Sequence, residues 1–355
     1  MAGIKQLITP PARLMAIVKA NAYGHGMIEV ARVCLEEGAA YLGVATPAEA
    51  LFLRENGITS DILAMGYVPE ASAEMMVENH IDAAVFTLKT ALALSKAAIR
   101  LHSEARIHLK IDTGMGRIGF DANNDSLEII KQISCMPGIV IQGVFSHLAT
   151  SDYADKTYAH QQLKIFQDYV QRIEEAGISI PIKHLANSAA IMEIPETHFD
   201  MVRAGITIYG LPPSEEVDKT KLALIPAMTL KSRISYVKTI PAGQSVSYGR
   251  TFISKQPTKV ATVSIGYADG YSRLLSNRSW AVIKGCKVPL IGTVCMDQCM
   301  FDVSGIDDVE IGDECIMFGK PEDGITADDL AAIIGTINYE IVCAPHSRIV
   351  RVYRD

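Results

Sequence analysis

Short apolar runs alternate with helix-like segments between residues 13 and 210, and this alternation limits the possible folds more than any other feature. Eight runs are candidate strands, at residues 13–20, 39–46, 61–66, 82–87, 105–112, 138–147, 183–187 and 201–209. Helical patterns separate most of them, at residues 27–37, 47–56, 69–79, 88–99, 126–133 and 158–176. Eight strands with intervening helices favour a parallel (β/α)8 barrel over an open sheet.

The sequence changes character after Leu211-Pro-Pro213, where candidate strands follow one another without long helices between them. These strands are residues 227–240, 245–249, 258–267, 279–285, 287–296, 299–304 and 314–319. One helical segment, residues 327–334, interrupts the series. We therefore predict a barrel domain at residues 1–222 and a mainly antiparallel β domain at residues 223–355.

Charge and hydropathy exclude several classes of partner. The formal net charge is −7 with both signs spread along the chain, so the sequence lacks the basic stripe needed to bind a nucleic-acid backbone. No segment reaches the roughly 18 uninterrupted apolar residues of a membrane span, and the first residues lack a signal-peptide core. We expect a soluble cytoplasmic protein without a nucleic-acid or membrane partner.

The seven cysteines are odd in number and scattered, mostly within apolar runs. This usage is typical of reduced, buried thiols in a cytosolic protein. Cys295 and Cys299 are close in sequence, but no second Cys or His pair has metal-ligand spacing. We therefore predict no bound metal.

Residues able to do chemistry fall at the carboxyl ends of the candidate strands, which form the functional face of a (β/α)8 barrel. They are spread over five different strand ends. They are Lys19 after the first run, Arg117 after the fifth, His147 at the end of the sixth, Asn187-Ser188 after the seventh, and Arg203, Gly205 and Ile206 in the eighth. This consistency predicts one site at the mouth of the barrel.

Lys19 ends a β-branched apolar run and is followed by a small-residue loop punctuated by Gly24 and Gly26. Desolvation at the tip of a buried strand would lower the pKa of its amine and make it a better nucleophile. A strand-end lysine that extends its ammonium group into water is the alternative interpretation.

Groups suited to binding a phosphate are spread over several segments. Hydroxyls and exposed backbone amides hold a phosphate dianion through several short hydrogen bonds, and barrels often build such a site after strands seven and eight. Taken singly, each group is also an ordinary loop residue. The candidates are Tyr23, Ser188, Gly205, Ile206 and Tyr339.

Gly114-Met-Gly-Arg-Ile-Gly119 matches the GxGxxG string of dinucleotide-binding folds. It comes late in the chain, and Asn123-Asn124 soon interrupts any helix, so we reject a dinucleotide site here. We expect the glycines to let the backbone bend so that Arg117 points into the barrel mouth. Its fixed charge there would engage a carboxylate or a cofactor oxygen.

Tyr267 lies on a Gly-rich turn at the end of a candidate strand of the second domain. A free tyrosine has a pKa near 10, so it becomes a useful base only beside a cation or a hydrogen-bonding partner such as His147. Tyr267 as a hydroxyl that caps a turn, and His147 as a satisfied core histidine, are the structural alternatives.

Five segments together resemble the alanine racemase family, the pyridoxal-phosphate enzymes of bacterial cell-wall (peptidoglycan) supply. The resemblance spans residue 13 to about residue 353, with the motifs in the family's order and spacing. The segments are Val18-Lys-Ala-Asn-Ala-Tyr-Gly-His-Gly26, Lys110-Ile-Asp-Thr-Gly-Met-Gly-Arg117, Arg203-Ala-Gly-Ile206, Ile265-Gly-Tyr-Ala-Asp-Gly270 and Val294-Cys-Met-Asp297.

The resemblance implies an isomerase that interconverts L- and D-alanine. Lys19 would bind pyridoxal 5'-phosphate covalently and act as the base for the α-proton of D-alanine. Tyr267 would act on the opposite face, for L-alanine, reaching in from the other subunit of a head-to-tail homodimer. Two bases suit inversion at a carbon, because a single base tends to return the proton to the face it left.

The resemblance also implies roles for the other candidates. Arg203 would hydrogen-bond the pyridine nitrogen of the cofactor, and His147 would pack beside the ring and support Arg203. Arg117 would hold the cofactor's phenolic oxygen and the substrate carboxylate, while Met296 and Tyr271 would line the substrate entrance. Lys110 matches a lysine that is often carbamylated in the family. The phosphate contacts would be Tyr23, Ser188, Gly205, Ile206 and Tyr339.

Other functions stay open on the sequence. A serine or broad-specificity racemase would use the same residues, and a non-catalytic pyridoxal-phosphate carrier would need only the Lys19 motif. A decarboxylase of related fold would place an acidic residue at the pyridine nitrogen, where Arg203 stands. The family normally begins earlier, with a Trp-containing strand that packs with the β domain, so we expect a shortened amino terminus.

Overall fold

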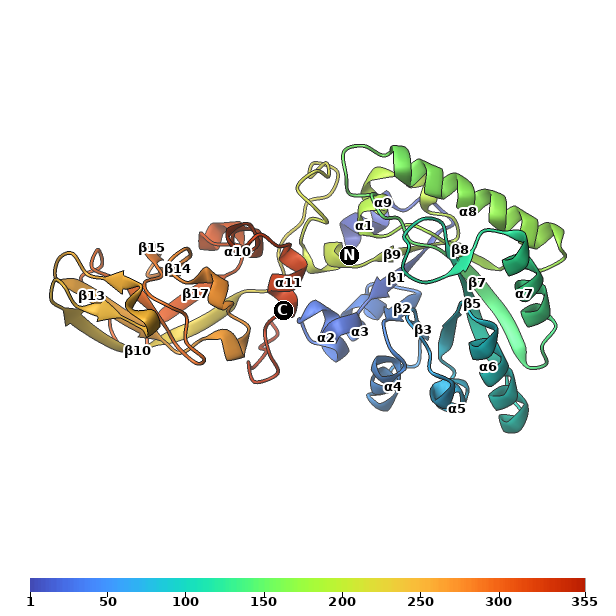
Figure 1. The fold of residues 1–355 in the computed structure, drawn as a ribbon, viewed down its shortest axis with the longest axis horizontal. Coiled ribbons are helices and arrows are strands. Elements are labelled where there is room, and N and C mark those ends of the chain that lie inside the picture. Colours follow the sequence, from blue (N-terminus) through green and yellow to red (C-terminus); the bar gives the residue numbers. More distant parts are fainter. Residues whose placement is uncertain (355) are drawn as a thin grey trace. The chain divides into compact units, whose positions relative to one another are not determined.

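A computed structural model describes residues 1–354 of the chain (Figure 1). The chain forms two compact units. The first comprises residues 1–22, 26–208 and 212–224, and the second comprises residues 23–25, 209–211 and the chain from residue 225 onward. The short segments 23–25 and 209–211 therefore pack with the second unit although the first surrounds them in sequence.

Eight parallel strands form the first unit in the order β8-β7-β5-β4-β3-β2-β1-β9, with short β6 beside β5. Backbone hydrogen bonds from Asp200 N to Lys183 O (3.1 Å) and from Arg203 N to Ala186 O (3.0 Å) link the two ends of this order. The strands are β1 (Arg13–Ile17), β2 (Tyr41–Val44), β3 (Asp61–Ala64), β4 (Asp82–Val85), β5 (Ala105–Asp112), β6 (Phe120–Asp121), β7 (Ile139–Phe145), β8 (Ile182–His184) and β9 (Met201–Ala204). All eight predicted strands are present, and the predicted barrel is confirmed.

The strands of the first unit are covered by helices, so most strand residues are buried on both faces. This is why they read as apolar runs rather than as alternating patterns. The helices of this unit are α1 (Ala2–Leu7), α2 (Lys19–Tyr23, whose last residue belongs to the second unit), α3 (Met27–Glu36), α4 (Pro47–Glu55), α5 (Ala73–Glu78), α6 (Leu88–Leu101), α7 (Asn124–Ser134), α8 (Thr157–Glu175) and α9 (Ser188–Glu193).

Side-chain caps set the starts of several helices. Thr46 and Glu49 form a capping box at α4, and Thr87 caps α6. No helix runs on from the GxGxxG string, as expected: β6 follows it, and α7 begins only after Asn123, whose side chain accepts a hydrogen bond from Ser126 N. The asparagine carbonyl oxygen thus satisfies a free amide at the start of α7.

The second unit holds a six-stranded antiparallel sheet in the order β15-β14-β17-β10-β13-β16, and a two-stranded ribbon of β11 and β12. Several predicted strands are shorter than expected, because turns at positive-φ glycines such as Gly292 interrupt them. The strands are β10 (Leu230–Ile240), β11 (Ser245–Val246), β12 (Phe252–Ile253), β13 (Thr258–Val263), β14 (Trp280–Ile283), β15 (Cys286–Pro289), β16 (Cys299–Asp302) and β17 (Glu314–Phe318), and the helices are α10 (Ala327–Ile334) and α11 (Asn338–Cys343).

The structure bears on the expectations about membrane spans and about cysteine burial. Within residues 1–354, none of the helices combines the length and apolar character that crossing a lipid bilayer requires. The cysteines are all free, but Cys135, Cys286 and Cys343 are exposed, which corrects the expectation of buried thiols. Cys135 directly follows α7, Cys286 begins β15 and Cys343 ends α11.

Candidate active site

Lys19 lies two residues beyond the end of β1 and begins a left-handed turn, α2. The four residues that follow it, Ala20 to Tyr23, have φ between 51° and 54°. For residues with a side chain this conformation costs about 1–2 kcal/mol each relative to the right-handed one. Such strain persists only where surrounding contacts hold it, and it concentrates at functional sites.

Glu49 holds the first part of this turn. Its Oε1 accepts a hydrogen bond from Ala20 N (2.7 Å), and its Oε2 accepts one from Ala45 N (2.8 Å). On the other side, the Asn21 side chain accepts a hydrogen bond from Met27 N (2.9 Å) at the start of α3. The turn is thus fixed between two helix starts, and Lys19, which is partly exposed, stands at its beginning.

Arg203 lies on β9, which pairs in parallel with β1, so Lys19 and Arg203 belong to neighbouring strand ends. Its side chain is only 4% exposed. Nη1 donates to His184 Nδ1 (3.0 Å) and to His184 O (2.9 Å). Nη2 donates to Ser146 O (2.7 Å) and Leu185 O (2.9 Å), and it lies 3.4 Å from His147 Nδ1. The guanidinium is therefore held by neutral acceptors.

These contacts involve the Nη1 and Nη2 groups of Arg203 and do not involve its Nε–H. Among the residues that the structure describes, no acceptor is assigned to it. A guanidinium has five N–H donors in a fixed fork, so holding the two amino groups also fixes the direction of Nε–H. A ligand atom that accepts a hydrogen bond would complete this set.

Several cations share this end of the barrel and shift one another's pKa values. Burial, followed by the charge of Arg117, lowers the pKa of Arg203 to about 9, so Arg203 is still cationic at neutral pH. Burial and the charge of Arg203 lower the pKa of Lys110 to about 7. Burial and the surrounding cations, Lys19 among them, hold the pKa of His147 well below its ordinary value. The site therefore attracts anions and keeps His147 neutral.

Ser188 and the segment after β9 form a second polar group. The Ser188 hydroxyl oxygen accepts hydrogen bonds from Gly205 N (2.8 Å) and from the Thr207 hydroxyl (3.2 Å). The structure thus brings together the predicted Ser188, Gly205 and Ile206, and adds the buried Thr207, which sequence reasoning missed. Asn187 supports them by capping α9 at Ala190 N (3.0 Å).

The two predicted phosphate-binding tyrosines, Tyr23 and Tyr339, lie in the second unit. Their ring centroids are 6.0 Å apart, and Tyr23 also lies 4.9 Å from Tyr209. Burial is the main reason that the pKa of Tyr23 is raised, so its hydroxyl stays protonated and able to donate. Gly24 continues this packing, because a Cβ there would lie 2.0 Å from Val342 O.

Arg117 is exposed in the loop that carries the three glycines of the GxGxxG string. Asp112 shapes this loop, accepting hydrogen bonds from Gly114 N (2.9 Å) and Gly116 N (3.2 Å). Burial alone would raise the pKa of Asp112, but these amides and Lys110 lower it below its ordinary value. The Asp112 carboxylate therefore holds the bend of this loop, as expected of glycines that serve a turn. Arg117, on the same loop, adds its positive charge to those of the neighbouring cations.

In the second unit, Tyr267 and Met296 lie on two turns that pack together. Tyr267 N donates to Cys295 O (3.0 Å), and a Cβ at Gly266 would lie 2.3 Å from Met296 O. Both predicted side chains are open, with Tyr267 42% and Met296 52% exposed. Arg348 links the same turns through Asp269 Oδ1 (2.6 Å) and Asp297 Oδ1 (2.7 Å).

Tyr271 does not fit the predicted entrance. Its side chain is 2% exposed, and its hydroxyl donates toward Ser279 Oγ (3.4 Å) in the interior of the β domain. Burial is also the main reason that its pKa is raised. This corrects the expectation that Tyr271 lines an entrance: an aromatic residue four positions beyond Tyr267 faces the core because the chain turns at Gly270.

Sequence reasoning missed a group of buried polar residues. His184, His108 and Asp82 lie on strands of the barrel, and Gln162 lies on α8. Gln162 Nε2 donates to His147 O (3.1 Å), and its Oε1 accepts from Ala149 N (2.8 Å), so it holds the loop that carries His147. The available signal was a lone polar residue within an otherwise apolar strand or helix face.

Comparisons with known proteins identify the family of the chain. The family model for the alanine racemase N-terminal domain matches residues 1–213, and the model for the alanine racemase C-terminal domain matches residues 227–353. An alanine racemase of Desulfosudis oleivorans is 47% identical, over 99% of this chain and 93% of the relative. An alanine racemase of Methanococcus maripaludis is 46% identical, over 99% and 94%.

Solved structures show the same likeness. An alanine racemase of Clostridium difficile has a TM-score of 0.94 at 41% identity, with 98% of this chain and 90% of that chain covered. An alanine racemase of Bacillus anthracis, solved with bound L-Ala-P, has a TM-score of 0.92 at 35% identity, with 98% and 89% covered. Matches of this extent and identity establish the family. This chain belongs to the alanine racemase family.

Proposed function

We propose that the chain is an isomerase that interconverts L- and D-alanine, supplying D-alanine for peptidoglycan, with pyridoxal 5'-phosphate as its cofactor. The observation that carries the proposal is the pairing of β1 with β9, which sets Lys19 and Arg203 at neighbouring strand ends. An amine and a buried guanidinium in this arrangement suit a cofactor that has both an aldehyde and a pyridine nitrogen.

The residues present fit this cofactor. Arg203 offers one N–H for which residues 1–354 provide no acceptor, and such a donor suits a pyridine nitrogen. The Ser188 hydroxyl and the backbone amides of Gly205 and Ile206 suit a phosphate, and we assign Tyr23 and Tyr339 to the same group. Lys19 would hold the cofactor covalently, and His147 would pack beside its ring.

The cofactor, when bound, withdraws electrons from the amino acid attached to it and so acidifies the α-proton. Arg203 limits how far this goes, because a guanidinium that keeps its own proton donates a hydrogen bond to the pyridine nitrogen without protonating it. The ring is then a weaker electron sink than one held by a carboxylic acid. We expect this to favour return of the proton over side reactions such as transamination.

Inversion needs a proton acceptor on each face of the α-carbon, and we assign Lys19 and Tyr267 to these faces. Lys19 takes the α-proton of D-alanine, and Tyr267 serves L-alanine. Because Tyr267 lies on an exposed turn of the β domain, we propose that it acts on the barrel of a second copy, in a head-to-tail homodimer with shared sites. Met296, on the packed neighbouring turn, would line the substrate entrance.

Arg117 and Lys110 complete the assignment. The exposed Arg117 would bind the substrate carboxylate and the phenolic oxygen of the cofactor. Lys110 has a pKa lowered to about 7, so a large share of its amine is neutral at neutral pH and free to react with carbon dioxide. The resulting carbamate is an anion, and it would sit among the cations Arg203 and Arg117. We further propose residues 1–222 and 223–355 as the two domains, in a cytoplasmic protein.

The deciding experiment incubates the protein and pyridoxal 5'-phosphate with L-alanine in deuterium oxide, and follows both chirality and α-deuteration. We expect D-alanine that carries deuterium at the α-carbon. Release of carbon dioxide would instead indicate a decarboxylase, and cofactor binding without turnover would indicate a carrier. L-serine measured in parallel reports how broad the substrate range is.

A further inference from the structure

A chain of buried polar side chains crosses the barrel interior and ends at Arg203. Arg203 Nη1 lies 3.0 Å from His184 Nδ1, and His184 Nε2 lies 3.0 Å from His108 Nδ1. His108 Nε2 then lies 3.3 Å from Asp82 Oδ2. The four residues come from β9, β8, β5 and β4, and none is more than 4% exposed.

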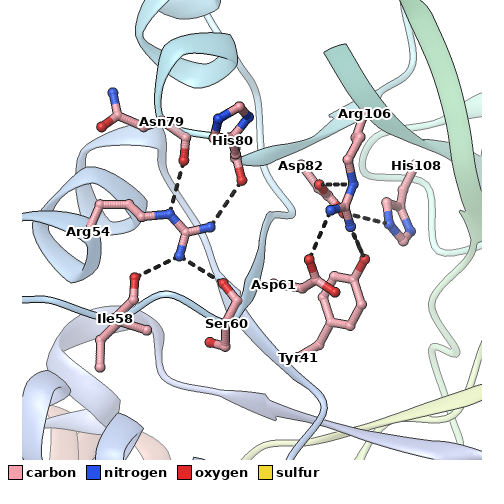
Figure 2. Close-up of polar contacts among 10 residues, drawn as sticks. All are labelled: Tyr41, Arg54, Ile58, Ser60, Asp61, Asn79, His80, Asp82, Arg106 and His108. Carbon is pink, nitrogen blue, oxygen red and sulfur yellow. Dashed lines mark hydrogen bonds and ion pairs between the residues drawn. The ribbon is translucent and has the colours of Figure 1, made fainter. Parts of the chain in front are cut away.

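The far end of this chain is firmly anchored. Figure 2 shows Asp82 joined by dashed lines to His108 and to Arg106, with Tyr41 and Asp61 beside them. Arg106 Nε lies 3.0 Å from Asp82 Oδ1, and the Tyr41 hydroxyl donates to Asp82 Oδ2 (2.9 Å). Arg106 also pairs with Asp61 at 2.9 Å. The contacts to Asp82 come from Arg106, Tyr41 and His108, and each of these groups can donate a hydrogen bond.

The donors and acceptors of the four residues fix the direction of each hydrogen bond between them. A guanidinium only donates, so His184 Nδ1 must accept and His184 Nε2 must carry the proton. That proton is donated to His108 Nδ1, which leaves the second proton on His108 Nε2, facing Asp82. Both histidines are then neutral, and burial also holds the pKa of His184 well below its ordinary value.

We propose that Asp82, His108 and His184 are positioning residues for Arg203. Asp82 fixes the tautomer of His108, His108 fixes that of His184, and His184 presents an acceptor to the guanidinium. The arrangement follows the general rule that a buried carboxylate orients the ring of a histidine that contacts the working group. The inference rests on the proposed function in one respect, namely that Arg203 contacts the cofactor.

The effect on Arg203 is directional. If His184 carried its proton on Nδ1, two donors would face each other at the 3.0 Å contact and the guanidinium would have to move. Its Nε–H would then point elsewhere, since the guanidinium is planar and rigid. The remote Asp82 thus controls the direction of the one Arg203 donor that the described residues leave for a ligand.

The first test measures the histidine tautomers by ¹⁵N NMR in selectively labelled protein without added cofactor. We expect His184 and His108 both to be neutral, with the proton on Nε2 and bare Nδ1. The resonances are assigned by their loss in the variants His184→Asn and His108→Gln. A proton on His184 Nδ1, or a cationic His184, would overturn the proposal whatever the enzyme's activity.

The second test replaces residues of the hydrogen-bonded series that do not contact Arg203. In Asp82→Asn, the carboxamide turns an N–H toward a group that is itself a donor, so we expect a mixture of His184 tautomers. In the loaded enzyme we expect kcat to fall by about 10–100-fold, as for other supporting residues, with KM for alanine little changed. We also expect weaker cofactor affinity in a spectrophotometric titration. His108→Gln, which can still donate to Asp82 but no longer reaches His184, should act in the same direction.

Arg54 provides the matched control, because it lies in the same region of the barrel but outside the chain (Figure 2). Its guanidinium donates to four backbone carbonyls, those of Ile58 (2.8 Å), Ser60 (2.7 Å), Asn79 (2.9 Å) and His80 (3.0 Å). Arg54→Lys should lower the thermal midpoint while leaving the His184 tautomer and kcat unchanged.

The outcomes separate this proposal from the proposed function. If the tautomers are as expected but the protein does not racemise alanine, the proposed function is wrong and the positioning role of Asp82, His108 and His184 stands. If the protein racemises alanine while folded Asp82→Asn and His108→Gln keep the parental tautomers and kcat, the proposed positioning role is wrong. If Asp82→Asn does not fold, His108→Gln and the parental tautomers decide.

Discussion

Lys110 and Arg203 approach the same aromatic ring, each with its cationic group 5.6 Å from the centroid of Phe145. Lys110 is 2% exposed, and its amine donates to Ile111 O at 2.7 Å. Burial, together with the charge of Arg203, lowers the pKa of Lys110 to about 7. Arg203, whose pKa is lowered to about 9, keeps its charge at neutral pH, whereas Lys110 loses much of its own.

The first prediction uses the pH dependence that follows. The pKa of Lys110 is about 7 in the folded chain, against an ordinary value of 10.5, so between these pH values the unfolded state binds more protons. Stability from this residue therefore increases as pH rises through this window, and its cost is fully present below pH 7. Lys110→Met should raise the thermal midpoint at neutral pH in carbon-dioxide-free buffer, and this gain should shrink toward pH 10.5. A gain independent of pH would contradict the assignment.

The second prediction concerns the left-handed turn after Lys19. Ala20 is exposed with φ 52°, so Ala20→Gly removes the left-handed penalty of about 1–2 kcal/mol while adding about 0.5–1 kcal/mol of backbone entropy to the unfolded chain. We expect the free energy of unfolding to rise by up to about 1 kcal/mol. Ala93→Gly, in the right-handed helix α6, is the matched control and should lower it by about 1 kcal/mol. Urea denaturation measures both, and equal signs would refute the strain argument.

Most of the fold could be predicted from the sequence because buried parallel strands appear as continuous apolar runs. Helix caps such as Thr46 are also visible in the local sequence. The site residues at strand ends were predictable for the same topological reason. The burial of Tyr271 was not, since it depends on how a turn at Gly270 directs the next side chain into the core. The partners of His184 were also hidden, because His108 and Asp82 meet it only through the cross-section of the barrel.

The third prediction tests the second base. Tyr267→Phe removes only a hydroxyl from an exposed side chain, so the fold and cofactor absorbance should match those of the parent. Racemisation should nearly stop, while exchange of the α-proton of D-alanine with deuterium oxide should continue, because Lys19 serves that face unaided. Tyr236→Phe alters another exposed tyrosine of the β domain and should leave both rates unchanged. Full racemisation by Tyr267→Phe would remove this residue from the mechanism.

The fourth prediction asks whether Lys19 and Tyr267 of one site come from different copies of the chain. Lys19→Ala and Tyr267→Phe should each be inactive alone. When the two variants are unfolded together and refolded, half of the dimers are mixed, and each mixed dimer has one site with both bases intact. Random mixing should therefore restore roughly a quarter of the parental racemase activity, as two-fold symmetry requires. If both bases came from the same chain, every site in the mixture would lack one of them, and no activity would return. Refolding each variant separately before mixing gives the baseline, because recovery then has to wait for subunit exchange.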